Sequence, residues 1–307
     1  MGRAPLPAGL VGGPFTVGQA RALGLRYCDL RRHGLSRPTH SVRTATPPKS
    51  LWERARAFAA ALPDDAAFSH VTAALLLGLP LTRVLELQPA LDVMRPSAVT
   101  PTRRKGCFGH RGLELREVVR VDGIAVVGPA DTWVDLGEVL HRGLDLDDLV
   151  VAGDVVANRV PEGAASMAAV LSGRTRPRGR RVLGDALALV RPGVRSPMET
   201  RSRLMFVRAG LPEPEVNATV HDTAGGWLLE GDLVWREQRV VGEYQGEEHA
   251  SRRRRSADAH RARLATAEGW TVLELFAEDV LLAPRRRVTL RRFATALGLD
   301  PRALHLD

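Results

Sequence analysis

The sequence contains very little cysteine and no long apolar run. Its two cysteines, Cys28 and Cys107, form neither a metal-binding spacing nor a disulfide framework, which is typical of a reducing compartment. The longest apolar runs, such as Ala73–Leu77, are far too short to cross a bilayer, and the N-terminal residues lack the apolar core of a signal peptide. We therefore expect a cytoplasmic protein with no membrane partner.

Lysine is almost absent as well. Only Lys49 and Lys105 are present, so arginine supplies 42 of the 44 basic residues. The net charge of +9 and the pI of about 10.8 favour a polyanionic partner such as DNA. The bias toward arginine also has a second explanation, a GC-rich genome. With 307 residues, 44% of them hydrophobic, the chain has enough material for two or three domains.

The most informative stretch runs from Trp227 to His249. Its period-2 alternation predicts two β-strands joined by a polar turn at 236–239. This hairpin would place Asp232 opposite Glu243, with the Cβ atoms about 5 Å apart. Two acids that close repel each other unless a cation lies between them, and oxygen ligands suit Mg²⁺ (or Mn²⁺). Asp232 and Glu243 are therefore the predicted metal ligands.

This region resembles a known nuclease family. Asp232, ten intervening residues and then Glu243-Tyr244-Gln245 resemble the PD-(D/E)XK core. GEYQGEEH, with SPMET before it and GWTVLEL after it, is similar to the bacterial family related to the very-short-patch (Vsr) mismatch endonucleases. The resemblance covers the last third of the chain. It implies a restriction-endonuclease-like mixed sheet flanked by helices over residues 195–307, and a metal-dependent DNA endonuclease. Gln245 replaces the family's lysine, which puts activity in doubt.

Other site residues are predicted in the same region. Glu199 caps a helix that begins after Ser196, and the resemblance adds a role near the metal. Gln245 can orient water or a phosphate oxygen by hydrogen bonds. His249 is either a general base or proton donor, or a surface loop residue. The predicted DNA contacts of this region are Arg252, Arg253, Arg254, Arg261 and Arg263.

The N-terminal residues 1–46 predict a small DNA-binding domain. A Thr16/Gln19 capping box opens a helix that ends at Gly24, a second helix covers 27–33, and 36–43 is extended. This order is that of a winged helix-turn-helix, with Arg26, Arg31 and Arg32 as DNA contacts. The segment resembles the N-terminal domain of AbiEi-type antitoxins, which implies operator DNA or a toxin as partner. The alternative is a helical cap with a solvated basic face.

Residues 50–171 predict an α+β middle domain without a catalytic constellation. Strands are expected at 91–94, 107–111, 114–121 and 124–127, and helices at 133–140 and 146–158. Residues 172–194 predict a basic linker, either a strap over DNA or a solvated flexible run. The whole chain is thus predicted to be a multi-domain α/β protein.

Two functions follow from these patterns. The first is a metal-dependent DNA endonuclease with an N-terminal DNA-binding module. The alternative is a non-catalytic transcriptional regulator or type IV antitoxin-like protein, in which the nuclease fold is degenerate. The sequence leaves the oligomeric state open.

Overall fold

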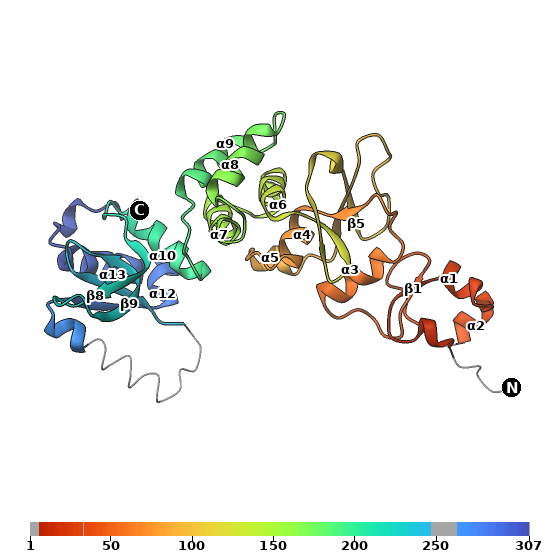
Figure 1. Ribbon diagram of the computed structural model, residues 1–307, viewed down its shortest axis with the longest axis horizontal. Coiled ribbons are helices and arrows are strands. Elements are labelled where there is room, and N and C mark those ends of the chain that lie inside the picture. Colours follow the sequence, from red (N-terminus) through yellow and green to blue (C-terminus); the bar gives the residue numbers. More distant parts are fainter. Residues whose placement is uncertain (1–5, 33, 247–262, 307) are drawn as a thin grey trace. The chain divides into compact units, whose positions relative to one another are not determined.

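The computed structural model describes residues 6–32, 34–246 and 263–306. The chain forms two compact units: residues 1–149 with 159–187, and residues 150–158 with 188–307. It is mixed α/β, and the described residues contain three separate β-sheets (Figure 1). Within this part of the chain, no helix is both long and apolar enough to cross a membrane.

The N-terminal part of the first unit consists of short elements. These are η1 (Ala8–Leu10), β1 (Phe15–Thr16), α1 (Val17–Ala22), α2 (Tyr27–Arg32) and β2 (Val42–Arg43). The expected capping box is present, because the Thr16 hydroxyl accepts from Gln19 N at 3.1 Å and the Gln19 side chain accepts from Thr16 N at 2.8 Å. Strands β1 and β2 pair antiparallel. A small core of Leu10, Phe15, Ala20 and Leu30 holds the two helices together.

A five-stranded sheet forms the centre of the first unit, in the order β5-β4-β3-β7-β6. Its strands are β3 (Ala67–Phe68), β4 (Leu91–Arg95), β5 (Cys107–Arg111), β6 (Val118–Val121) and β7 (Ile124–Val127). The Asp122-Gly123 turn joins β6 to β7, and both of its residues have positive φ. The strand expected at 114–121 is shorter because 113–115 form a 3₁₀ turn, η2 (Leu113–Leu115).

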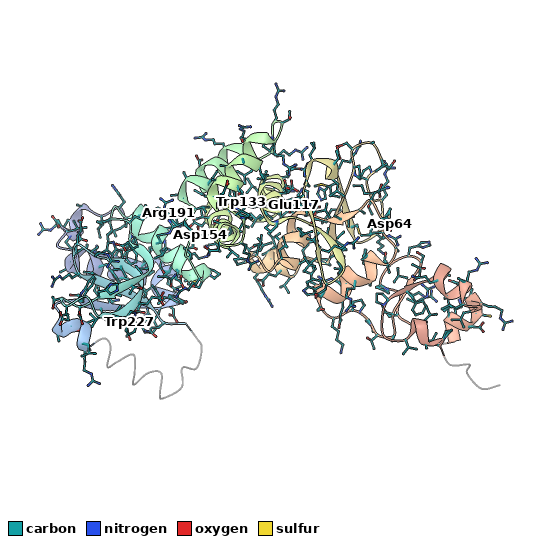
Figure 2. All side chains as sticks on the ribbon, viewed as in Figure 1. Asp64, Glu117, Trp133, Asp154, Arg191 and Trp227 are labelled. Carbon is teal, nitrogen blue, oxygen red and sulfur yellow. The ribbon has the colours of Figure 1, made fainter. Side chains whose placement is uncertain are left out.

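Helices connect and follow these strands. They are α3 (Leu51–Ala59), α4 (His70–Leu76), α5 (Arg83–Glu86), α6 (Pro129–Leu136), η3 (Gly137–Arg142), α7 (Leu146–Ala157), α8 (Ala164–Gly173) and α9 (Arg180–Leu189). Of these, α3 and α4 pack directly on the sheet. The helix expected at 133–140 starts earlier because Pro129 occupies the first turn, where its missing N–H costs nothing. Trp133 is fully buried among these helices, and its Nε1 donates to Leu149 O at 2.8 Å (Figure 2).

The segment 172–194 differs from the expected basic linker. Its centre is helix α9, and the helix buries Leu183 and Ala186. The apolar residues recur at helical spacing, so that one face of α9 packs inward while Arg180 and Arg181 stay exposed. The segment is therefore largely part of the fold.

The second unit contains a four-stranded mixed sheet in the order β11-β10-β9-β8. Its elements are α10 (Pro197–Arg208), β8 (Glu215–His221), β9 (Trp227–Trp235), β10 (Val240–Tyr244), β11 (Thr271–Leu275), α12 (Ala277–Leu281), α13 (Ala283–Ala296) and η4 (Pro301–Ala303). Strands β8, β9 and β10 are antiparallel, whereas β11 runs parallel to β10. The alternating apolar residues of 270–276 predict a central strand, but β11 lies at a sheet edge. Both faces of this edge strand are nevertheless packed, Leu273 and Leu275 on the α13 side and Val272 on the Ala265 side.

The two faces of this sheet are covered differently. On one face, Phe206 of α10 and Phe293 of α13 pack on Leu233 and Trp235, with the Phe206 and Phe293 ring centroids 4.6 Å apart. On the other face Val234 and Val241 pack against Ala265 in the short helix at 263–267.

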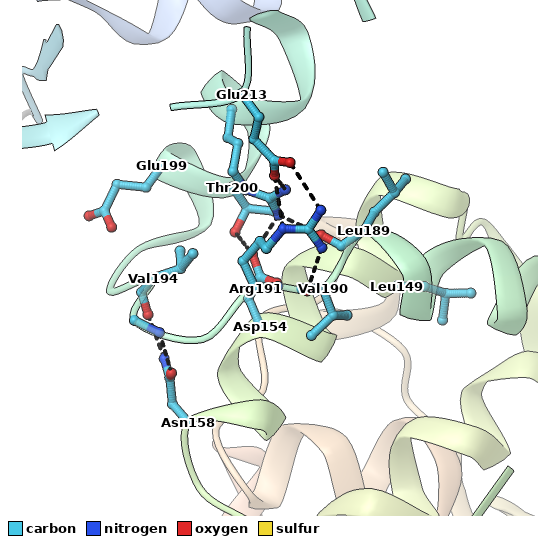
Figure 3. A network of polar contacts seen from close by, with 12 residues as sticks. Leu149, Asp154, Asn158, Leu189, Val190, Arg191, Val194, Glu199, Thr200 and Glu213 are labelled. Carbon is cyan, nitrogen blue, oxygen red and sulfur yellow. Dashed lines mark hydrogen bonds and ion pairs between the residues drawn. The ribbon is translucent and has the colours of Figure 1, made fainter. Parts of the chain in front are cut away.

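A buried polar network ties residues 150–158 into the second unit. Asp154 accepts hydrogen bonds from Thr200 Oγ1 at 2.8 Å and from Arg203 at 3.3 Å. Arg203 is fully buried and also donates to Glu213 at 2.9 Å. Glu199 precedes Thr200 but points away from this network (Figure 3). Thr200 and Arg203 thus anchor α10 to Asp154, while the Glu199 side chain points away from these anchors.

Candidate functional site

The two predicted metal ligands come together at the end of the β9–β10 ladder. The last paired residues are Leu233 and Gly242, so the register brings Asp232 next to Glu243. Both acids are half-buried. Beyond this pair the regular backbone pairing stops. There the backbone N–H of Tyr244 donates to the side-chain Oδ2 of Asp232 at 2.8 Å. The expected hairpin is therefore present, with a side chain in place of its next backbone acceptor.

Asp232 lies in negatively charged surroundings. Its pKa is raised above the ordinary carboxyl value first by burial, and the charges of Glu199 and Glu230 raise it further. The Tyr244 N–H and the Arg195 guanidinium act in the opposite direction, but they do not reverse the shift. A carboxylate in this position gains from a nearby cation.

Glu199 belongs to this site through Asn217. Asn217 Nδ2 donates to Oε2 of Glu199 at 2.6 Å and to Gly193 O at 2.9 Å. Asn217 sits between Val216 and Ala218, which pair with Leu233 and Gly231, so it lies beside Asp232 on the opposite side from Glu243.

The strands are distorted at this point. Asn217 has φ of 47°, in the left-handed region that asparagine tolerates. Val216 and Leu233 pack on the α13 face, but Ala218 and Leu229 pack on the Ala265 face, so the alternation inverts across Asn217. Such irregularities re-aim side chains next to functional sites. Sequence reasoning missed Asn217, although an asparagine inside a β-run is a usable signal.

The capping role of Glu199 is observed only in part. Ser196 Oγ accepts from Glu199 N at 3.2 Å, as expected for an N-cap. The Glu199 side chain, however, accepts from Arg195 N at 2.8 Å and not from Ser196 N. Glu199 is 7% exposed as a residue.

The other predicted residues of this region are spread out. Gln245 is exposed just beyond β10, and its backbone N donates to Leu275 O at 2.7 Å. Arg263 is exposed on the helix at 263–267. His249, Arg252, Arg253, Arg254 and Arg261 lie outside the described residues.

Two of the N-terminal arginines are on the surface. Arg26 is exposed and pairs with Asp29, with Nε and Oδ2 3.3 Å apart. Arg31 is exposed, and its guanidinium carbon lies 5.4 Å from the centre of the Tyr27 ring. Arg32 is the last residue of α2. These arginines lie on or beside one short helix.

A second group of possible ligands lies in the first unit, and sequence reasoning missed it. Ligand atoms of His70, Asp92 and His110 lie within 4.8 Å of one another, the one such three-residue group among the described residues. His70 starts α4 directly after β3, and Asp92 and His110 come from the adjacent strands β4 and β5. The signal was weak, because the three residues are widely separated in sequence. Ser69 stands at the N-cap of α4, but its hydroxyl bonds His70 Nδ1 at 3.0 Å and makes no capping bond.

This His-Asp-His group is organised as a polar network. Oδ1 of Asp92 accepts from Arg142 NH1 and bonds His110 Nε2, each at 2.8 Å. The His70 and His110 rings stack with centroids 3.7 Å apart and planes at 24°, so their in-plane nitrogens do not converge on one point. Because Arg142 already neutralises Asp92, the group fits a buried ion network better than a metal centre. Burial lowers the pKa of His110, although its hydrogen bond to Asp92 acts in the opposite direction.

Comparison with known proteins adds distant relatives. No family model matches the chain. Two Mycobacterium tuberculosis proteins, "Uncharacterized protein MT2308" (strain CDC 1551 / Oshkosh) and "Uncharacterized protein Rv2248" (strain ATCC 25618 / H37Rv), are each 26% identical over 182 residues. The alignment spans 59% of this chain and 65% of theirs.

One solved structure is also similar. It is the crystal structure of the RV2827C protein from Mycobacterium tuberculosis, with a TM-score of 0.39 and 15% identity. The match covers 68% of this chain and 83% of that one.

Proposed function

We propose that the second unit is a metal-dependent DNA endonuclease domain that hydrolyses phosphodiester bonds. The observation that carries the proposal is the position of Asp232. Its half-buried carboxylate, whose pKa is raised, stands beside Glu243 at the end of the β9–β10 ladder.

The residues present fit a hard divalent cation. Asp232 and Glu243 offer only oxygen ligands, and Mg²⁺ is commonly held by one or two carboxylates together with water. The burial of Asp232 near Glu199 and Glu230 creates an excess of negative charge that such a cation neutralises. When bound, Mg²⁺ or Mn²⁺ supplies an activated water and stabilises charge on the phosphorus.

The chain's own groups prepare this site. The Tyr244 N–H fixes the orientation of the Asp232 carboxylate, and Asn217 holds Glu199 in place. Among the described residues, Arg195 is a cation whose charge lowers the pKa of Asp232. It is 62% exposed and pairs with Glu230 at 2.6 Å, so it can reach a phosphate at the surface. We propose that Arg195 provides the positive charge that lysine supplies in related nucleases, while Gln245 orients water or phosphate.

The decisive experiment is cleavage of plasmid and mismatched duplex DNA with Mg²⁺ or Mn²⁺. We expect nicking by the wild type and its loss in Asp232→Asn and Glu243→Gln. Glu237→Gln is the matched control, because Glu237 is an exposed acid in the same hairpin turn. Equal nicking by Asp232→Asn would rule out this site.

A second function is supported by Gln245, which occupies the lysine position and is exposed. In this alternative the protein is a non-catalytic DNA-binding regulator that uses the arginines of α2 (Arg31, Arg32) and the adjacent Arg26. Such a protein binds its promoter in EDTA, loses that binding when residues 1–46 are deleted, and cleaves DNA under no metal condition. Binding must also weaken steeply with salt, since it neutralises phosphates.

A further inference from the structure

A cavity of about 760 Å³ lies in the first unit, far in sequence from Asp232 and Glu243. Its wall includes side chains of α1, α2, β2 and α3 and the loop before β5. No aspartate or glutamate lines it, whereas four cationic residues do: Arg37, Arg43, Arg54 and Lys105. The cavity is therefore strongly positive.

Arg43 is the most unusual of these cations. It is 5% exposed, and its NH1 donates to the Val42 carbonyl at 2.8 Å. No described carboxylate forms an ion pair with it. The other strongly buried arginines differ, since Arg174 pairs with Asp131 and Arg203 pairs with Asp154 and Glu213. A buried guanidinium without a counter-charge is costly, so an external anion would stabilise it.

Arg54 provides a second free donor at the same wall. Its Nε is buried and has no hydrogen-bond partner among the described residues. Its NH2 makes one long bond, 3.4 Å, to Gln88 O. Guanidinium groups bind phosphate through charge-assisted N–H donors, and no described carboxylate forms an ion pair with Arg54.

The wall between these arginines is held in place before any ligand arrives. Arg104 NH1 donates to His40 O at 2.6 Å and to Thr39 Oγ1 at 3.3 Å, while its NH2 donates to Ala61 O at 3.2 Å. One side chain thus joins the loop before β2 to the end of α3. A preformed wall lowers the entropy cost of binding.

The rest of the wall combines the polar residues Thr39, His40 and Ser41 with apolar and aromatic ones. It includes Tyr27, Phe58, Pro38 and Pro89. Ligand cavities typically measure about 300–1,000 Å³ and combine apolar walls with a few polar anchors. A flat ring can stack on Tyr27 while phosphates reach the arginines.

We propose that this cavity binds a phosphorylated small molecule of nucleotide size, with Arg43 and Arg54 holding the phosphate groups. The site is separate from the acids of the second unit and needs no metal. The phosphate groups of the ligand supply a counter-charge for Arg43, which is buried without an ion pair to any described carboxylate.

The test is calorimetric titration of the full-length protein with adenosine and guanosine triphosphate and with pyrophosphate, all in EDTA. EDTA removes metal-dependent binding at the acids. We expect binding of at least one nucleotide, weakened about tenfold or more in Arg54→Gln and in Arg43→Gln, which remove charged hydrogen bonds. Lys105→Gln should weaken it less, because Lys105 is exposed.

Arg103→Gln is the matched control, an exposed neighbour that does not line the cavity, and it should bind as the wild type does. Unliganded Arg43→Gln must melt no lower than the wild type, because it loses an unpaired buried charge, and nucleotide should raise its melting temperature less than that of the wild type. Absence of binding at millimolar nucleotide overturns the proposal. So does binding that is indifferent to Arg43 and Arg54. If these substitutions weaken only duplex DNA binding, the arginines serve a DNA backbone and the proposal also fails.

Discussion

The backbone N–H of Tyr244 donates a 2.8 Å hydrogen bond to Oδ2 of Asp232, at the point where the regular pairing of β9 and β10 stops. One carboxylate oxygen therefore holds the end of β10 in place. The remaining negative charge is half-buried near Glu199 and Glu230. The Asp232 carboxylate is thus fixed in orientation, and its negative charge is unfavourable in these surroundings. Both properties are expected of a cation ligand.

Replacing Asp232 with asparagine should stabilise the metal-free protein at neutral pH. The folded-state pKa of Asp232 lies above the ordinary 3.8, so the folded protein binds this proton more tightly than the unfolded chain. Wild-type stability therefore falls as pH rises from about 3.8 through the raised pKa. The Asp232→Asn variant should not show this loss of stability, and its side-chain oxygen can still accept the hydrogen bond from Tyr244 N. Urea unfolding between pH 4 and 8 in EDTA measures it.

Divalent metal should make the wild type more stable than Asp232→Asn. Mg²⁺ or Mn²⁺ is expected to raise the urea midpoint of the wild type and to leave Asp232→Asn unchanged, because binding to the folded state adds stability by mass action. If Asp232→Asn is less stable than the wild type at pH 7 in EDTA, the electrostatic account of this site is wrong.

Asn217 should matter both for stability and for the site. Asn217→Gly keeps the backbone at φ 47° but removes the hydrogen bonds to Glu199 and Gly193, at a cost of about 1–2 kcal/mol. Asn217→Asp keeps the shape but places a second carboxylate against Glu199. We expect the Asp variant to lose more stability at pH 7 than at pH 4, in contrast to the Gly variant. Equal pH profiles for the two would contradict the contact.

The His70-Asp92-His110 network should make the first unit sensitive to acid. The pKa of His110 lies below its ordinary 6.5, mainly through burial, so the unfolded chain takes up this proton first. Stability is then fully present above about pH 6.5 and is lost as pH falls through the lowered pKa. Calorimetric melts from pH 5 to 8 should show a weaker acid loss in His110→Gln. His221→Gln, an exposed histidine at the end of β8, serves as control and should follow the wild type.

The two cysteines should differ sharply in reactivity. Burial raises the pKa of Cys107 from 9.0 to about 11, whereas Cys28 is exposed. The Cys107 thiolate is then about a hundredfold scarcer than that of an ordinary thiol. Ellman's reagent should give one fast and one slow phase in the native protein. Cys28→Ser should remove the fast phase, and a persisting fast phase would show that Cys107 is accessible.

Local sequence patterns were sufficient for much of the fold. The Thr16/Gln19 capping box, the turn at Asp122-Gly123 and the hairpin that ends near Glu243 are all observed. Each depends on residues only a few positions apart, so nearby side chains and turn conformations decide it. The pairing of Asp232 with the strand of Glu243 belongs to this class.

Other features had no local signal. The edge position of β11 and the meeting of His70 with His110 both depend on which distant surfaces pack together. Periodicity shows that a face is apolar but does not say what covers it.

The amino-acid sequence by itself determined the hairpin, the helix caps and the two acids at the end of the ladder, because alternation and capping act over a few residues. Only the tertiary structure decided that Asn217 holds Glu199 beside Asp232, and that Arg43 is buried without a carboxylate. Burial and charge at a site depend on every segment that folds against it, and those segments come from far apart in the chain.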